Sequence, residues 1–263
     1  MDHLIDLETY PVDQPESGAY LALVQHCRAR LATTGMFELP GFFRPEATRQ
    51  AVETARPLMD TESFRHARRH NVYFRDSVEG LSADHPAMAR VDTVHHTLNG
   101  AQLHDNPVTE LYEWAPFADF LARTMGKPAI HCMNDAVGRV NIQSSREGEA
   151  LNWHFDQSEF TTTILLQSPE KGGELEYRKD LRSEDAPNYA GVKAVLAGED
   201  PEVRRIALKE GALNVFRGVH TLHRVVPVEG PRERMVAIFS FYDRPGVTMS
   251  TKDQIGFYGQ AGG

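Results

Sequence analysis

The sequence predicts an α+β protein in which helices come first and a β-sandwich or β-barrel forms the core. Two observations support this fold class. The first part of the chain carries apolar residues at three- and four-residue steps, which is the spacing of helices with one buried face. From about residue 130, short β-branched or alternating runs are separated by Gly, Pro and Asn, as in antiparallel strands. At 263 residues, the length favours one elaborated domain over residues 1–263.

The helical spacing before residue 130 occurs in three segments, residues 17–32, 45–59 and 106–126. Ser17 is a candidate N-cap of the first helix, and Pro45 stands at the start of the second, where proline is tolerated. Gly126 is a candidate end of the third. Residues 62–105 are polar, rich in Arg and His, and weakly periodic, so we expect a loop with short elements that forms a lid or a wall of an active site. Residues 1–129 thus form a mostly helical N-terminal part.

Seven runs predict the strands of the core: VGRVNIQ, NWHFD, FTTTILLQ, GGELEY, VRRIALK, GALNVF and RMVAIFSFY. An insertion over residues 178–201 interrupts these runs, and we expect it to be a loop with one helix from about Asn188 to Ala197. The β core therefore spans residues 130–245, and residues 246–263 form a C-terminal tail.

Composition and charge exclude several classes of function. With 28 basic and 37 acidic residues the formal charge is −9, which repels phosphate backbones and anionic lipids, so we expect neither nucleic acid nor a membrane as a partner. No run of 18 apolar residues occurs, and the start of the chain lacks the features of a secretory signal. Two cysteines are too few for a disulfide scaffold, which favours a cytoplasmic location. The oligomeric state stays open.

The run NWHFDQ contains two residues that can bind one metal ion. His154 and Asp156 are separated by one residue, and on a strand this spacing points both side chains to the same face. His223, at the start of another strand-like run, is the expected third ligand, with His220 as an alternative. Two histidines and one carboxylate leave one face of a metal open, which is the arrangement in non-haem Fe(II) oxygenases. We therefore expect His154, Asp156 and His223 to form a catalytic metal site.

The order of motifs around these residues strengthens the interpretation. H-x-D is followed by G-G-x-L, G-x-x-x-x-F, H-x-V-x-P and a basic residue about ten positions later. Over residues 130–245 this resembles the double-stranded β-helix of Fe(II)/2-oxoglutarate-dependent oxygenases. In finer detail, NWHFDQSEFTTTILLQSPEKGGELEY and HRVVPVEGPRERMVAIFSFYDRPG are similar to the free-amino-acid radical halogenase and hydroxylase group. The resemblance implies a cupin-like jelly-roll barrel with N-terminal helices packed on it, and Fe(II), 2-oxoglutarate and O₂ as cofactors.

The resemblance also implies residues that bind the cosubstrate. The far carboxylate of 2-oxoglutarate needs a fixed cation, for which Arg offers a bidentate fork. Arg232 and Arg234 both qualify by position, and Arg234 is favoured because it opens the long apolar strand, whereas Arg232 follows the turn at Gly230-Pro231. Asn141 and Gln143 occupy positions where the superfamily often places polar side chains near the cosubstrate. Both could equally be outward-facing residues of a half-buried strand.

Asp156 bears on the type of reaction. In the resembled halogenases a small residue replaces this carboxylate, which leaves a coordination site for halide. Because the carboxylate is retained here, we expect hydroxylation of an unactivated C–H bond in a free amino acid or a close derivative, coupled to decarboxylation of 2-oxoglutarate to succinate and CO₂. Desaturation or cyclisation is an alternative outcome. A non-catalytic metal-binding module of cupin type is a second alternative, and it would not need a carboxylate anchor at Arg234.

Two residues are candidates for contacts with the substrate. Arg75 lies in the polar segment 62–105 and could bind the carboxylate of an amino acid, and Asn134 precedes the first barrel strand. The same region holds histidines at irregular intervals that lack cysteine partners, so we expect surface or lid residues instead of a second metal site. These histidines are His66, His70, His95, His96 and His104.

Overall fold

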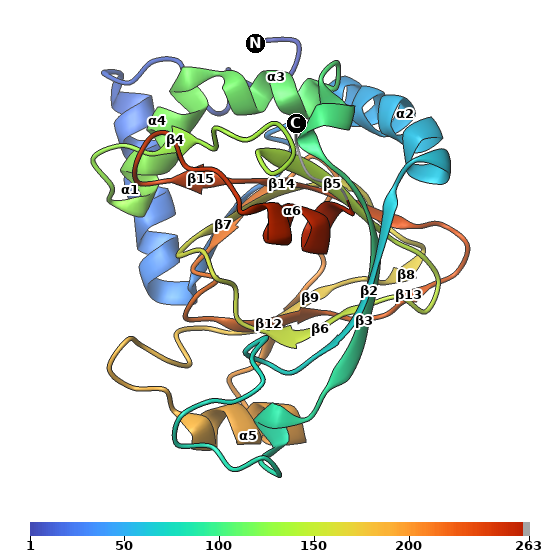
Figure 1. The fold of residues 1–263 in the computed structure, drawn as a ribbon. Helices are drawn as coiled ribbons and strands as arrows, with labels where there is room; N and C mark the ends of the chain where they lie inside the picture. The colour runs from blue at the N-terminus through green and yellow to red at the C-terminus, as the bar shows by residue number, and fades with distance from the viewer. Residues whose placement is uncertain (260–263) are drawn as a thin grey trace.

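Two antiparallel β-sheets face each other, and helices cover the outer side of the larger sheet (Figure 1). The computed structural model describes residues 1–259. The larger sheet has the strand order β1 (Met36–Leu39), β11 (Leu213–Phe216), β7 (Thr161–Gln167), β14 (Arg234–Phe239), β5 (Val140–Ser145), β3 (Val91–Leu98) and β2 (Phe64–His70). The smaller sheet has the order β10 (Arg204–Ile206), β9 (Leu175–Arg178), β12 (Leu222–Val225) and β6 (Leu151–His154). Two short pairs join β13 (Val228–Glu229) to β8 (Lys171–Gly172) and β15 (Phe241–Tyr242) to β4 (His131–Cys132).

The helices that cover the larger sheet come from the first half of the chain. They are α1 (Gly18–Thr34), α2 (Pro45–Thr61), α3 (Pro107–Glu113) and α4 (Ala115–Met125), with the 3₁₀ turn η2 (Gly100–Leu103) between α2 and α3. Ser17 caps α1 as predicted, because its hydroxyl accepts a hydrogen bond from the Tyr20 backbone N–H at 3.1 Å. No helix within residues 1–259 is long and apolar enough to cross a membrane.

The single helix predicted over residues 106–126 is wrong in one respect, because it consists of two helices that meet at Trp114. This residue has ψ 110°, outside the helical region, and Pro116 follows at the start of α4. Proline has no N–H, so Pro116 could not have donated a hydrogen bond to the Tyr112 carbonyl in a continuous helix. That carbonyl instead accepts a contact from the Cys132 thiol at 3.3 Å.

The larger sheet has one dry face and one face directed at a cavity, because successive side chains of a strand alternate. The dry face packs on the helices and includes Val140, Ile142, Met235, Ala237 and Phe239. The intervening residues of the same two strands line the cavity between the sheets: Asn141, Gln143, Arg234, Val236 and Ile238. The period-two pattern therefore decides which residues stabilise the fold and which can contact a ligand.

The segment 62–105 is not a loop with short elements, since it contains a long pair of strands. β2 and β3 pair from Phe64 with Thr97 to His70 with Val91, and β3 continues the sheet by pairing with β5. The apolar alternation that would have revealed β2 is missing because its buried, inward positions hold histidines, His66 and His70. Strands whose inward residues are polar lack the apolar alternation that predicts a strand, so these two strands were not predicted from the sequence.

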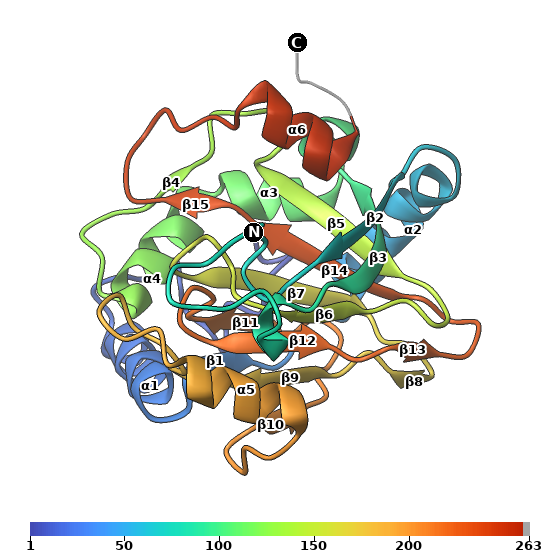
Figure 2. The same cartoon turned by 60° about the horizontal axis from the view of Figure 1, so that its bottom comes forward.

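The connection between β2 and β3 lies outside the smaller sheet, on the side that comes forward in Figure 2. Its residues belong to a second hydrophobic cluster. It contains the 3₁₀ turn η1 (Pro86–Met88), which contacts α5 (Tyr189–Ala197). Val72 and Phe155 are buried in this cluster together with residues of α5. The helix predicted within the insertion is therefore present, and Asn188 caps it by accepting a hydrogen bond from the Gly191 N–H at 3.1 Å. A last helix, α6 (Thr251–Tyr258), lies beside the cavity.

Candidate active site

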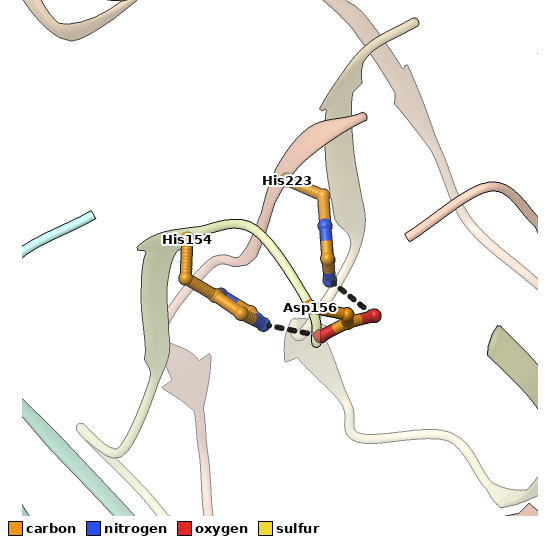
Figure 3. Close-up of side chains that lie close together, drawn as sticks. All are labelled: His154, Asp156 and His223. Carbon is orange, nitrogen blue, oxygen red and sulfur yellow. Dashed lines mark ion pairs between the residues drawn. The ribbon is translucent and has the colours of Figure 1, made fainter. Parts of the chain in front are cut away.

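Three side chains of the type that binds metals converge in the cavity (Figure 3). His154 ends β6 and His223 lies on β12, and the two residues are direct partners in the register of these strands. This pairing explains how residues 69 positions apart in the sequence come together. Asp156 follows two residues after His154, and one ligand atom from each of the three side chains lies within 4.8 Å of the others. Asp156 Oδ1 lies 3.2 Å from His154 Nε2, and Asp156 Oδ2 lies 3.5 Å from His223 Nε2.

Hydrogen bonds on the far side of each imidazole fix its tautomer. His154 Nδ1 donates to the Asn152 carbonyl at 2.8 Å, and His223 Nδ1 donates to the Thr221 carbonyl at 2.9 Å. Both Nε2 atoms then face the carboxylate. Burial lowers the pKa of His223 to about 4, so its neutral Nε2 directs a lone pair toward a negative group. A cation between these atoms removes this repulsion, and hydrogen bonds from Nδ1 to backbone carbonyls are the usual support for metal-binding histidines.

The carboxylate of Asp156 is held ionised and in a fixed position. Burial raises its pKa, but the charge of His223 in its protonated form, the neighbouring His154 and the hydroxyl of Thr161 together lower the pKa below its ordinary value. Thr161 donates a hydrogen bond to Oδ2. Gly218 is required beside this group, because a Cβ atom there would lie 2.3 Å from the same oxygen. Two imidazole nitrogens and one anionic oxygen fit a divalent transition metal such as Fe(II).

Arg234 is an unpaired cation in the same cavity. Its side chain is 8% exposed, and burial lowers its pKa to about 10, so it is charged at neutral pH. No side chain within residues 1–259 forms a hydrogen bond or an ion pair with its guanidinium. A buried unpaired charge is costly, and binding of an anion in the cavity would offset that cost. The carboxylate of 2-oxoglutarate that is remote from the keto group fits this requirement.

The neighbours of Arg234 have different surroundings. Arg232 is exposed and donates to Glu210 at 2.8 Å, so it lies outside the cavity and is not placed to bind a cosubstrate. Glu233 is 9% exposed and accepts hydrogen bonds from Arg56 Nη1 at 2.8 Å and from the Ser144 hydroxyl. Because Glu233 is occupied by these partners, it does not neutralise Arg234.

Asn141 and Gln143 both line the cavity, so they do not point outward. Asn141 is 5% exposed and its Nδ2 donates to the Tyr258 hydroxyl at 3.4 Å, while its Oδ1 has no partner within residues 1–259. Tyr258 belongs to α6, and this contact joins the C-terminal helix to the cavity. The two amides are therefore available to a bound molecule.

The two residues expected to contact the substrate do not line this cavity. Arg75 is exposed in the connection between β2 and β3, and its backbone N–H donates to Asn71 Oδ1 at 3.2 Å. Asn134 is exposed, and its backbone N–H donates to the Val247 carbonyl at 2.8 Å. Local sequence placed these residues near the barrel but could not show on which side of the backbone they lie.

The wall of the cavity that β2, β3 and α6 form contains residues that the sequence did not single out as site residues. Its residues include His66, Arg68, His95, Phe257 and Tyr258. The signal was present in FRHARRH, where Phe, His, Arg and His alternate at period two. Together with the metal-binding residues they enclose a cavity of about 350 Å³, which is the volume of a small-molecule site.

Comparisons with known proteins agree with this architecture. A family model described as Halogenase D matches residues 21–254. Comparison with the curated proteins gives no match. Among solved structures, the chain is similar to a 2OG-Fe(II) oxygenase family oxidoreductase from Burkholderia pseudomallei, with 16% identity, TM-score 0.53, and coverage of 88% of this chain and 94% of that one.

Two further solved structures that are similar to this chain are described as enzymes of different types, an epimerase and a hydroxylase. The nogalamycin-biosynthesis epimerase SnoN, described as non-heme and α-ketoglutarate-dependent, has 15% identity, TM-score 0.54, and coverage of 83% of this chain and 81% of its own. A prolyl hydroxylase from Trichoplax adhaerens, bound to a peptide fragment of hypoxia inducible factor, has 14% identity, TM-score 0.53, and coverage of 86% and 94%. These likenesses confirm the predicted double-stranded β-helix.

Proposed function

We propose that this chain, which belongs to the halogenase D family of Fe(II)/2-oxoglutarate-dependent oxygenases, hydroxylates an unactivated C–H bond of a small free amino acid or close derivative. His154, Asp156 and His223 would hold Fe(II), and Arg234 would bind the far carboxylate of 2-oxoglutarate. When bound, the metal and the cosubstrate supply the oxidising power that breaks the C–H bond, while 2-oxoglutarate becomes succinate and CO₂.

The observation that carries this proposal is the unpaired, buried Arg234 in the same cavity as the three metal-binding side chains. A cupin-type module that only bound a metal would have no need for a buried cation at this place. Asn141 and Gln143, which line the cavity on the strand next to β14, are placed to orient a bound cosubstrate by hydrogen bonds.

The carboxylate of Asp156 supports hydroxylation in a family named for halogenation. Both of its oxygens are directed at imidazole Nε2 atoms, and the Thr161 hydroxyl and the tight approach of Gly218 restrict its movement. A halide would need the coordination position that this carboxylate occupies. Desaturation or cyclisation requires the same three ligands, so the identity of the product decides between these outcomes.

A small substrate is supported by the volume of the cavity and by the acidic charge of the chain, which disfavours nucleic acid. The test is succinate formation from 2-oxoglutarate under air with added Fe(II), measured with and without each standard amino acid. We expect one or a few free amino acids to stimulate succinate release. Stimulation only by peptides or nucleosides would reject this substrate class, and absence of any succinate would reject the oxygenase function.

A further inference from the structure

Arg68 is a second cation that borders the cavity, and within residues 1–259 its guanidinium has no hydrogen-bond or ion-pair partner. It lies on β2, on the same inward face as His66 and His70. Its Nε is buried and has no hydrogen-bond partner, and no carboxylate within residues 1–259 lies close enough to form an ion pair with it. A guanidinium that is half-buried and unpaired at the edge of a cavity is suited to binding an anion there.

Two aromatic rings hold this guanidinium in place. Its Cζ lies 4.2 Å from the centroid of Phe74 and 5.4 Å from the centroid of Phe257 on α6. Contacts with ring faces leave the N–H groups in the plane of the guanidinium for a bidentate ligand. The Phe74 ring in turn lies 5.5 Å from the ring of His154, centroid to centroid. Arg68 is therefore separated from the metal-binding side chains by about one aromatic ring.

The groups beside Arg68 add no competing charge. His66 and His95 are direct partners in the β2–β3 register, and their rings stack at 4.7 Å. Burial lowers the pKa of His66 to about 4 and that of His95 to about 3, so both rings are neutral at pH 7. Nδ1 of each ring has no hydrogen-bond partner within the described part of the chain. Arg68 thus supplies the fixed positive charge of this side, beside neutral imidazoles that can hydrogen-bond to a ligand.

We propose that Arg68 binds the carboxylate of the substrate and thereby selects free amino acids over their uncharged derivatives. The inference rests on the proposed function and makes it more specific, since it assigns a different carboxylate to each of the two arginines that line the cavity. Arg234 binds the cosubstrate, and Arg68 binds the substrate. With its carboxylate held at Arg68, a substrate would extend past Phe74 toward His154, so that a carbon of its side chain would lie near the three metal-binding side chains.

The experiment compares wild type with Arg68→Gln and Arg68→Lys, and uses Arg75→Gln as the matched control. Arg75 is an exposed arginine in the connection that follows β2, and it does not line the cavity. Each protein is loaded anaerobically with Fe(II) and 2-oxoglutarate and titrated calorimetrically with the standard amino acids. The tightest binder is then compared with its carboxamide and its methyl ester, which keep the amino group and side chain but lose the negative charge.

We expect wild type and Arg75→Gln to bind the free acid at least about 30-fold more tightly than the carboxamide, as for loss of a buried charged partner. Arg68→Gln should bind acid and amide alike, and Arg68→Lys should keep part of the preference. Under air, the KM for the amino acid should rise in Arg68→Gln by more than the KM for 2-oxoglutarate.

Three results would overturn the assignment of Arg68. They are an undiminished preference for the acid in Arg68→Gln, binding of no free amino acid by wild type, and an increase confined to the KM for 2-oxoglutarate. Failure of the proposed function gives a different result. Wild type would then form no succinate with any amino acid, carboxamide or methyl ester, whereas calorimetry would still measure its preference for the free acid.

Discussion

The two sides of the cavity differ in how their charged groups are held. On the metal side, His154 and His223 come from one pair of strands, Asp156 follows the first of these strands, and hydrogen bonds fix each of the three. On the other side, which we call the β2–β3 side, Arg68 and His95 are held by stacking and strand pairing, and their polar atoms lack partners. The side chains of the metal side are thus held by hydrogen bonds within the protein. On the β2–β3 side, by contrast, Nε of Arg68 and Nδ1 of His95 form no hydrogen bond within residues 1–259 and can bind a ligand.

This difference predicts two roles: the metal side is needed for the reaction itself, and the β2–β3 side determines which substrate is bound. Changes on the metal side should remove turnover for every substrate, because they remove a group that any reaction at this site requires. Changes on the β2–β3 side should alter which molecule is accepted. The following predictions test the comparison, beginning with the largest expected effect.

His223→Ala should abolish Fe(II) binding and bring succinate formation below detection. The substitution removes one of three ligands, and loss of groups that merely orient a ligand already costs about 10–100-fold. Iron content per protein chain and the visible band formed anaerobically with Fe(II) and 2-oxoglutarate measure binding. His220→Ala is the control, because His220 lies outside the group of three. If His220→Ala loses iron and His223→Ala retains it, the ligand has been misassigned.

Arg234→Ala should raise the KM for 2-oxoglutarate strongly while iron binding persists. Loss of one partner of a buried charged pair costs about 2–5 kcal/mol, or a factor of about 30 or more. Arg232→Ala should have little effect, because that side chain is exposed and paired with Glu210. Initial rates at varied 2-oxoglutarate concentration measure both variants, and the reverse ranking would contradict the role of Arg234.

Asp135→Asn should loosen α6 and weaken the β2–β3 side without affecting the metal. One oxygen of Asp135 accepts from the Val137 and Gly138 N–H groups at 2.9 and 3.0 Å, and the other accepts from the Met249 N–H at 3.0 Å. An amide at this position leaves a donor unmatched, so the free energy of unfolding should fall by about 1–3 kcal/mol.

Hydrogen exchange over residues 249–258 and the KM for the amino acid measure the effect of Asp135→Asn. Both should increase, while the iron content stays the same. Lys252→Gln is the control, since Lys252 is exposed on α6 itself and its side chain forms no hydrogen bond or ion pair within residues 1–259. Unchanged exchange in Asp135→Asn would show that α6 does not depend on this carboxylate.

The buried histidines should make stability depend on pH in the acid range. Burial lowers the pKa of His66 to about 4, against 6.5 for an ordinary histidine. Between these pH values the unfolded chain therefore binds a proton at this residue and the folded protein does not, which favours unfolding. This contribution is complete above about pH 6.5 and is lost as pH falls toward 4. His66→Gln should reduce the loss of unfolding free energy between these limits by up to about 3 kcal/mol, as measured by denaturant titration at several pH values. An equally steep profile in the variant would exclude His66 as a source.

The sequence was informative where chemistry depends on close neighbours. The spacing of His154 and Asp156 and the motif around His223 predicted that these side chains would converge, and the order of strands singled out Arg234. The sequence leads us to expect a lid or wall formed by residues 62–105, but not the strands β2 and β3 or their inward residues. Those inward positions are polar, and the ring of Phe257 that contacts Arg68 comes from the C-terminal helix. Arg75 is the substrate residue expected from the sequence, and without the strand β2 the direction of its side chain could not be known.

The central claim is that a metal centre with three protein ligands, Asp156 included, hydroxylates and does not halogenate. The most direct measurement is the mass of the product that wild type forms from its stimulating amino acid in buffer with high chloride and isotopically labelled O₂. We predict the gain of one oxygen atom derived from O₂ and no chlorine. A main product that carries the isotope pair of chlorine would contradict the account, because it would require a coordination position that Asp156 is expected to fill.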